Sequence, residues 1–213
     1  MKRETFSIDG PAGRLEAMLE YGERPAATAV VCHPHPLYQG TMHNKVVYTL
    51  ARAAVQSGAA ALRFNFRGVG HSEGRHDNGR GELEDFRAAE RWLEARYPGL
   101  ARWRLGFSFG AAIVIRASSE DSCDVLVTVA PPVDRFSDYA LDGSAPQARR
   151  WLLAQGDGDE VVSAEATLAW ARSLGRPPEV AVFEGVGHFF HGNLTVLRRR
   201  VCATLSGTNE EQV

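Results

Sequence analysis

Short apolar runs alternate along this chain with segments whose apolar residues recur at helical spacing. The apolar runs are typical of buried strands and cover residues 28–32, 59–64, 103–105, 125–129, 151–154 and 180–183. The helical segments cover residues 44–57, the stripe of Leu83, Phe86, Ala89 and Leu93, the residues from Phe109 on, residues 164–174 and the C-terminal part. Strands separated by helices predict right-handed crossovers, and hence a mainly parallel sheet with helices on both faces.

Three segments depart from this alternation. Residues 5–8 and 14–20 have the pattern of two strands joined at residues 9–13, which predicts a hairpin before the first helix. A glycine-rich loop is expected at residues 67–81, and an irregular connection at residues 131–146. Because the chain between Val129 and Trp151 is long enough only for loops or one short helix, we expect no cap domain.

The length and composition fit one domain. With 213 residues, of which 44% are hydrophobic, the chain can bury one sizeable core, whereas two domains would both be small. We therefore expect a single α/β domain over residues 1–207 and a short disordered tail over residues 208–213.

The charge pattern excludes some classes of protein. A formal net charge of −2 gives no basic excess that would attract nucleic acid, and residues 198–200, all arginine, are expected on the wet side of the last helix. The N-terminus has no apolar signal segment and no run is long enough to cross a bilayer, so we expect a soluble cytoplasmic protein, monomeric or a small homo-oligomer. Cys32, Cys123 and Cys202 are widely spaced and odd in number, which predicts free, mostly buried thiols.

The most specific chemical signal is the pentapeptide GFSFG at residues 106–110, between a predicted strand and a predicted helix. A serine in such a G-x-S-x-G turn presents its hydroxyl as a nucleophile. The glycines are needed because strand and helix approach so closely there that a side chain would clash. The helix that starts at Phe109 would point its first N–H groups and the positive end of its dipole at Ser108.

A nucleophilic serine of this kind needs an acid and a histidine that follow it in the chain, each just past a strand. His188 comes after residues 180–183 and is the expected general base. The acid is expected after residues 151–154, where Asp159 is favoured because Asp157 lies between two glycines and has an ordinary turn-forming explanation. Asp134 is a third candidate, although the Pro-Pro pair before it gives that loop a structural reason of its own.

Backbone donors for an oxyanion are expected at Phe109 and in the loop at residues 33–40, HPHPLYQG. The prolines have no N–H, so the second donor is His35 or Leu37, and His35 is favoured by its distance after the strand. The histidines at positions 33, 35 and 43 are interpreted as solvent-facing or loop-packing, because alternate residues at a strand end point to opposite sides and no carboxylate is fixed nearby to complete a metal site. Arg67 is interpreted as holding its loop by an ion pair.

These motifs resemble those of the α/β-hydrolase superfamily, and specifically its small lidless bacterial members related to dienelactone-hydrolase-like esterases. The resemblance covers almost the whole chain and rests on HPHP at 33–36, MHNKVV at 42–47, FNFRGVG at 64–70, GFSFG at 106–110, GDGD at 156–159 and GHFF at 187–190. It implies an eight-stranded sheet whose first strands are antiparallel, and a Ser108–Asp159–His188 triad. Two positions depart from the pattern: Pro34 follows His33 where glycine is common, and Gln39 precedes Gly40 where similar proteins often have two glycines.

The resulting hypothesis is a serine hydrolase that cleaves small carboxylic esters through an acyl-enzyme and needs no cofactor. A thioesterase or a small-peptide hydrolase would use the same triad, and only the pocket distinguishes them. An alternative outside the enzymes is a non-catalytic protein of the same fold that binds a partner or a small ligand.

Overall fold

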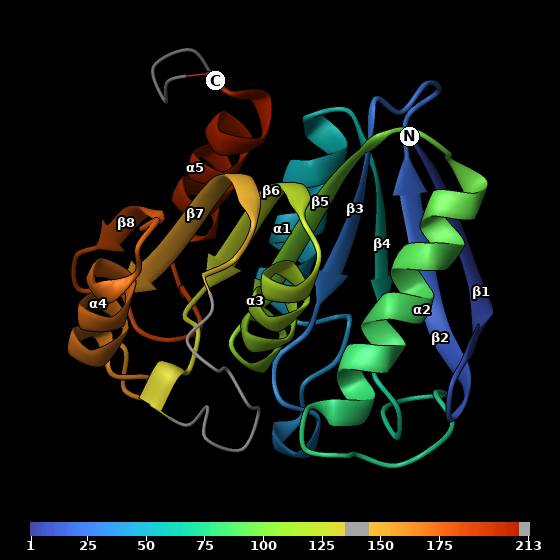
Figure 1. Ribbon diagram of the computed structural model, residues 1–213, viewed down its shortest axis with the longest axis horizontal. Coiled ribbons are helices and arrows are strands. Elements are labelled where there is room, and N and C mark those ends of the chain that lie inside the picture. Colours follow the sequence, from blue (N-terminus) through green and yellow to red (C-terminus); the bar gives the residue numbers. More distant parts are fainter. Residues whose placement is uncertain (135–144, 209–213) are drawn as a thin grey trace.

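The computed structural model describes residues 1–134 and 145–208, which build one eight-stranded sheet with helices on both faces (Figure 1). The strand order across the sheet is β1-β2-β4-β3-β5-β6-β7-β8. The strands are β1 (Lys2–Gly10), β2 (Gly13–Tyr21), β3 (Ala27–Cys32), β4 (Ala59–Phe64), β5 (Ala101–Phe107), β6 (Cys123–Val129), β7 (Ala148–Gly156) and β8 (Glu179–Phe183). The helices are η1 (Pro36–Tyr38, a 3-10 turn), α1 (Lys45–Gln56), α2 (Arg80–Arg96), α3 (Phe109–Glu120), α4 (Ala164–Ser173) and α5 (Leu194–Ser206). The predicted fold class is confirmed.

The antiparallel part of the sheet is its N-terminal edge. β1 pairs with β2 and β2 with β4 in antiparallel fashion, whereas the pairs from β4 through to β8 are parallel. Gly10 lies opposite Gly13, so the predicted hairpin turns on two residues and its strands are longer than the pattern indicated. Burial alternates along much of β2, while β3 and β4 are buried throughout because helices cover both faces of the parallel strands.

Two hydrophobic cores, one on each face of the sheet, hold the helices. Leu50 of α1 and Val201 of α5 belong to one core, and Phe86 of α2 and Ile113 of α3 belong to the other. Figure 1 shows the same division, with α2, α3 and α4 in front of the sheet and α1 and α5 behind it. The cysteines at positions 32, 123 and 202 are buried free thiols, as their spacing predicts.

The element boundaries follow from local capping. α1 begins at Lys45, one residue later than expected, because the Asn44 side chain accepts hydrogen bonds from the N–H groups of Val46 and Val47 and so serves as the N-cap. β5 continues to Phe107 and delivers the next residue to the carboxyl edge of the sheet. The loops after β3, β7 and β8 leave the sheet at this same edge, which is where parallel α/β sheets place their ligand sites.

Two expectations fall on residues that are not described. Residues 135–144, in the connection expected to contain no cap domain, and residues 209–213 of the expected tail lie outside the described residues. Thr208, the first residue assigned to that tail, donates its N–H to the Ala203 carbonyl at 3.1 Å and so caps the end of α5.

Candidate active site

Ser108 lies at the sharp turn between β5 and α3. Its φ is 53° and its ψ is −119°, a strained conformation for a residue that carries a side chain. A Cβ at Gly106 would lie 2.3 Å from the Gly110 carbonyl oxygen, and a Cβ at Gly110 would lie 2.4 Å from the Cys32 carbonyl oxygen. Both glycines are therefore required by close backbone approach, and the second one lets the end of β3 pack directly against the start of α3.

Asp159 and His188 reach Ser108 from two adjacent strands. Asp159 follows β7 and His188 follows β8, and these strands pair in parallel. His188 Nε2 lies 3.1 Å from Ser108 Oγ, and His188 Nδ1 lies 2.8 Å from Asp159 Oδ2. Ser108 is 8% exposed and His188 3%, so water screens these contacts little. The structure thus brings the three residues predicted from the sequence into one hydrogen-bonded chain.

The Asp159 carboxylate is held by several donors besides His188. The N–H groups of Val161 and Val162 donate to Oδ1 at 2.9 and 2.8 Å, and Gln155 Nε2 donates to Oδ2 at 3.2 Å. Burial by itself raises the pKa of Asp159, but the bonds from His188, Val162 and Val161 outweigh it and the pKa lies below its ordinary value. An ionised Asp159 keeps the hydrogen on His188 Nδ1, which leaves Nε2 as an acceptor for the serine hydroxyl.

The other carboxylates considered from the sequence have different surroundings. Asp157 Oδ1 accepts a hydrogen bond from the Gly185 N–H at 2.6 Å and so ties the turn after β7 to the turn after β8. Asp134 is exposed at the end of the loop segment described after β6. Glu160, which the sequence reasoning did not single out, accepts a hydrogen bond from the His188 N–H at 3.3 Å. Within the described ranges, Asp159 is the one carboxylate bonded to the His188 ring.

A buried histidine anchors the loop after β3. His33 has no exposed surface, its Nδ1 lies 2.6 Å from the Pro34 carbonyl oxygen, and its Nε2 accepts the Phe66 N–H at 3.0 Å. Because Nε2 is the acceptor, Nδ1 carries the hydrogen and donates to Pro34. Burial lowers the pKa of His33 to about 4, so the ring is neutral at neutral pH. Of the two roles considered for this histidine, the structure assigns the loop-packing one.

The two candidate donors in this loop differ in their hydrogen bonds. The Leu37 N–H donates to His35 Nδ1 at 3.2 Å, whereas the His35 N–H meets no acceptor in the part of the chain that the structure describes. The His35 ring lies beside Phe109, with 5.0 Å between ring centroids. Burial and the nearby His76 lower the pKa of His35 to about 4. The His35 ring is therefore neutral at neutral pH.

Sequence reasoning missed two residues that support the site. His76, in the glycine-rich loop, lies 4.9 Å from the His35 ring and 5.9 Å from the Phe109 ring, and its Nδ1 is 2.8 Å from Glu82 Oε1. Gln155 is a buried residue of β7 whose side-chain amide donates a hydrogen bond to the Asp159 carboxylate. No local pattern marks either residue, because each reaches the site only through the packing of separate elements.

These side chains open into a cavity of about 660 Å³. Ser108 and His188 lie in its wall, together with the largely apolar side chains of Tyr38, Val161 and Phe189. Tyr38 is 78% exposed and Phe189 41%, so apolar surface borders the mouth of the cavity. A cavity of this size, with a few polar groups among apolar walls, suits a small organic ligand.

Three further expectations concern other parts of the chain. Arg67 forms its predicted ion pair, with Asp85 at 2.7 Å. Among the described residues, no group of three or more His, Cys, Asp and Glu side chains is placed to hold a metal ion. None of the described helices combines the length and apolar character that crossing a membrane requires.

Comparisons with known proteins find relatives over almost the whole chain. No family model matches it. It is 37% identical over 191 residues to the uncharacterized protein RP471 of Rickettsia prowazekii, a match that covers 86% of this chain and 80% of that protein. Among solved structures, an α/β serine hydrolase homologue from Coxiella burnetii is 44% identical, with a TM-score of 0.88 over 95% of this chain and 97% of that one. XC6422 from Xanthomonas campestris, an α/β serine hydrolase without a lid, is 38% identical, with a TM-score of 0.88 over 94% of this chain and 92% of that one. With relatives this similar over nearly its whole length, the chain belongs to the α/β-hydrolase superfamily and to its small, lidless serine hydrolase homologues.

Proposed function

We propose that this protein hydrolyses small carboxylic esters through an acyl-enzyme formed on Ser108. The observation that carries the proposal is the unbroken hydrogen-bonded chain from Ser108 Oγ through His188 to Asp159, at the wall of a cavity that can hold a small ester. The likeness to serine hydrolases supports a hydrolase role independently of this geometry.

In the first half of the reaction, Ser108 Oγ attacks the carbonyl carbon of the ester and its proton moves to His188 Nε2. Asp159 stabilises the imidazolium that forms. The tetrahedral intermediate then expels the alcohol oxygen, which takes the proton back from His188. An alcohol leaves and the acyl group remains bound to the serine.

In the second half, water takes the place of the alcohol. His188 accepts a proton from the water as its oxygen attacks the acyl carbon, and returns that proton to Ser108 Oγ when the carboxylic acid leaves. One ester and one water give one alcohol and one acid. Besides ester and water, the scheme uses only groups of this chain, and no cofactor enters it.

The oxyanion of each tetrahedral intermediate is assigned to the N–H groups of Phe109 and His35. Two observations support this choice. The absence of a side chain at Gly110 lets the residues after β3 approach the first turn of α3, and the Leu37 N–H already donates to His35 Nδ1. Proline at position 34, where glycine is common in similar proteins, therefore does not remove the donor, because the N–H used is that of the next residue.

The substrate is expected to be a short, soluble ester. The cavity has about 660 Å³, and its apolar border is exposed, so a short acyl or alcohol group gains contact without entering a deep tunnel. We expect a panel of p-nitrophenyl esters to be cleaved best at short acyl chains, without a jump in rate when longer esters aggregate. Thioesters and amides in the same panel test the two alternatives that share the triad.

An active-site-directed fluorophosphonate tests the assignment of Ser108 directly. Intact-mass analysis should show one covalent label on the wild-type protein and none on Ser108→Ala. Ser119→Ala is the matched control, since Ser119 lies on α3 with its hydroxyl donating to the Arg116 carbonyl, and it should be labelled like the wild type. A folded wild-type protein that takes no label would contradict the proposal and favour the non-catalytic binding protein.

A further inference from the structure

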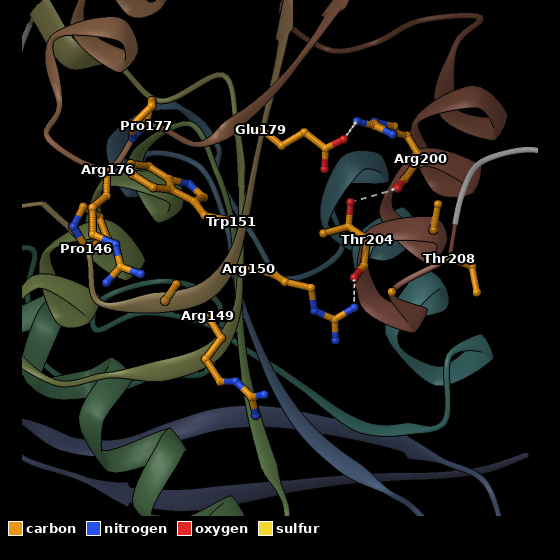
Figure 2. Close-up of a pocket in the computed structure, with 13 residues that line it drawn as sticks. Pro146, Arg149, Arg150, Trp151, Arg176, Pro177, Glu179, Arg200, Thr204 and Thr208 are labelled. Carbon is orange, nitrogen blue, oxygen red and sulfur yellow. Dashed lines mark hydrogen bonds and ion pairs between the residues drawn. The ribbon is translucent and has the colours of Figure 1, made fainter.

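Figure 2 shows a second cavity, of about 730 Å³. It lies at the amino end of β7, whereas Ser108 follows the carboxyl end of β5. It is formed by the first residues of β7 and β8, the segment after α4 and the C-terminal half of α5. β7 runs from this cavity to the site of Asp159. The six residue steps from Arg150 to Gly156 span roughly 20 Å, so the two cavities are separate.

Arginine dominates the walls of this second cavity. Arg149, Arg150, Arg176 and Arg200 all line it, and Glu179 is the one carboxylate among its described lining residues. The whole chain, by contrast, has 24 Lys and Arg against 26 Asp and Glu. The four guanidinium groups come from three places in the sequence, so tertiary packing has gathered positive charge here in a protein whose overall charge is negative.

The arginines differ in how their charge is balanced. Arg200 pairs with Glu179, and Arg149, whose side chain is 84% exposed, contacts Asp124 at 3.4 Å. Within the described ranges, neither Arg150 nor Arg176 forms an ion pair with a carboxylate. Exposed pairs such as that of Arg149 contribute little and exchange readily with a better partner. Counted over the described residues alone, the lining of the cavity and its printed ion-pair partners keep a net positive charge.

Arg150 is fixed in position before any ligand arrives. Figure 2 shows its guanidinium reaching the end of α5, where it donates to the carbonyl oxygens of Thr204 and Leu205 at 2.6 and 3.2 Å. Gly207, with φ 70°, packs so closely that a Cβ there would lie 2.5 Å from Arg150 Nη1. A guanidinium held this way loses little conformational entropy when it binds an anion.

Apolar side chains complete the cavity. Trp151, which is 8% exposed, forms part of the wall, and its indole N–H donates to Thr128 Oγ1 at 3.0 Å. Pro146 and Pro177 also line it, on the side of Arg176. A ligand that fills this space would therefore meet both guanidinium groups and apolar surface.

We propose that this cavity is a binding site for a small organic phosphate carrying two or more negative charges. The planar fork of arginine matches phosphate oxygens with two parallel hydrogen bonds, and several arginines from different elements suit an anion with more than one charge. The site is distinct from the proposed ester-cleaving site and does not depend on it.

Inorganic pyrophosphate is the probe for the test, measured by isothermal titration calorimetry and by the thermal unfolding midpoint, against sodium chloride of equal ionic strength. Pyrophosphate should bind with one site per chain and raise the unfolding midpoint, since a ligand of the folded state stabilises it. Sodium chloride should do neither. Both readouts are independent of turnover, so they hold whether or not the protein is an esterase.

Single substitutions locate the site. Arg176→Gln and Arg150→Gln should each weaken pyrophosphate binding by about tenfold, the worth of one charge-assisted hydrogen bond. If Arg150→Gln does not fold because the carbonyl groups at the end of α5 lose their partner, Arg176→Gln alone decides the test. Arg91→Gln removes the same charge from an exposed position on α2 and should bind like the wild type. The proposal is overturned if pyrophosphate gives no more effect than sodium chloride, or if Arg91→Gln weakens binding as much as Arg176→Gln.

Discussion

The two edges of the parallel sheet contrast in burial and in the state of their charges. At the carboxyl edge, the side chains of His188 and Asp159 are buried and hydrogen-bonded to each other, and His188 is hydrogen-bonded to Ser108. At the amino edge of β7 and β8, four arginines face a cavity that is open to solvent, and two of them form no ion pair among the described residues.

The contrast teaches where a single side chain matters most. In a water-excluded site each hydrogen bond is electrostatically strong and an unpaired group is costly, so single changes at the carboxyl edge should have large effects. At an exposed edge, salt screens charges beyond about 8–10 Å, so each arginine contributes a modest share. The predictions below test this difference, beginning with the largest effect.

Ser108→Ala should reduce ester turnover by a factor on the order of 10⁶, because it removes the covalent route while the hydroxyl contributes nothing to core packing. The substitution is measured by steady-state hydrolysis of p-nitrophenyl acetate, with circular dichroism to establish folding. Ser119→Ala on the same helix should keep wild-type turnover. Near-normal rates in a folded Ser108→Ala protein would remove Ser108 from the mechanism.

Asp159→Asn should reduce turnover by up to about 10⁴-fold, because an amide at this position supports the wrong tautomer of His188. Asp157→Asn and Asp134→Asn are the matched controls and should lose much less, since Asp157 binds the Gly185 N–H and Asp134 is exposed. Steady-state kinetics of the three variants decide the point. If Asp134→Asn loses most of its turnover and Asp159→Asn does not, the acid has been assigned to the loop after the wrong strand.

The free energy of unfolding should fall as the pH is lowered from about 6.5 to about 4, with His33 a principal cause. The folded-state pKa of His33 is about 4 and its ordinary value is 6.5, so the unfolded chain binds more protons between these values and acid favours unfolding. The difference between these two pKa values corresponds to about 3–4 kcal/mol, or roughly a 300-fold change in the folding equilibrium.

Urea unfolding of the wild type and His33→Gln across this pH range measures the effect. The variant should be less stable at pH 7 and should have a flatter pH profile. His191→Gln, at an exposed position, should retain the wild-type slope. An unchanged slope in His33→Gln would mean that another group controls the acid sensitivity.

The smallest expected effect is a difference in salt dependence between the two edges of the sheet. Raising sodium chloride from about 0.05 to 0.5 M should weaken pyrophosphate binding several-fold, because the arginines lie in water, and should leave kcat/KM for a neutral ester within about twofold. The two quantities are measured on the same preparation by calorimetry and by ester hydrolysis. If pyrophosphate affinity and kcat/KM depended equally on salt, the arginine cavity and the Ser108 site would not differ in their exposure to solvent ions.

Most of the fold could be predicted because buried strands and amphipathic helices leave their own periodic patterns. The boundaries were less accessible, since they depend on caps such as Asn44 and on pairing that extends β7 back to Ala148. The candidate triad was accessible for a second reason: the loop after each strand end of a parallel sheet arrives at one edge. Chain order therefore favoured the convergence of Ser108, an acid after residues 151–154 and His188.

The sequence by itself determined the fold class, because strand and helix patterns alternate along the whole chain. It also determined the nucleophile turn and the preference for Asp159 over Asp157, because each of these depends on the residue types within one short segment. Only the tertiary structure decided which N–H groups are already engaged, that His33 is a neutral anchor, and that His76 and Gln155 support the site. It also decided that Arg150, Arg176 and Arg200 share one cavity, whereas the sequence placed residues 198–200 only on the wet side of a helix. The physical reason is that these relations join residues far apart in the chain, and packing between β7, β8 and α5 sets distances that no local pattern contains.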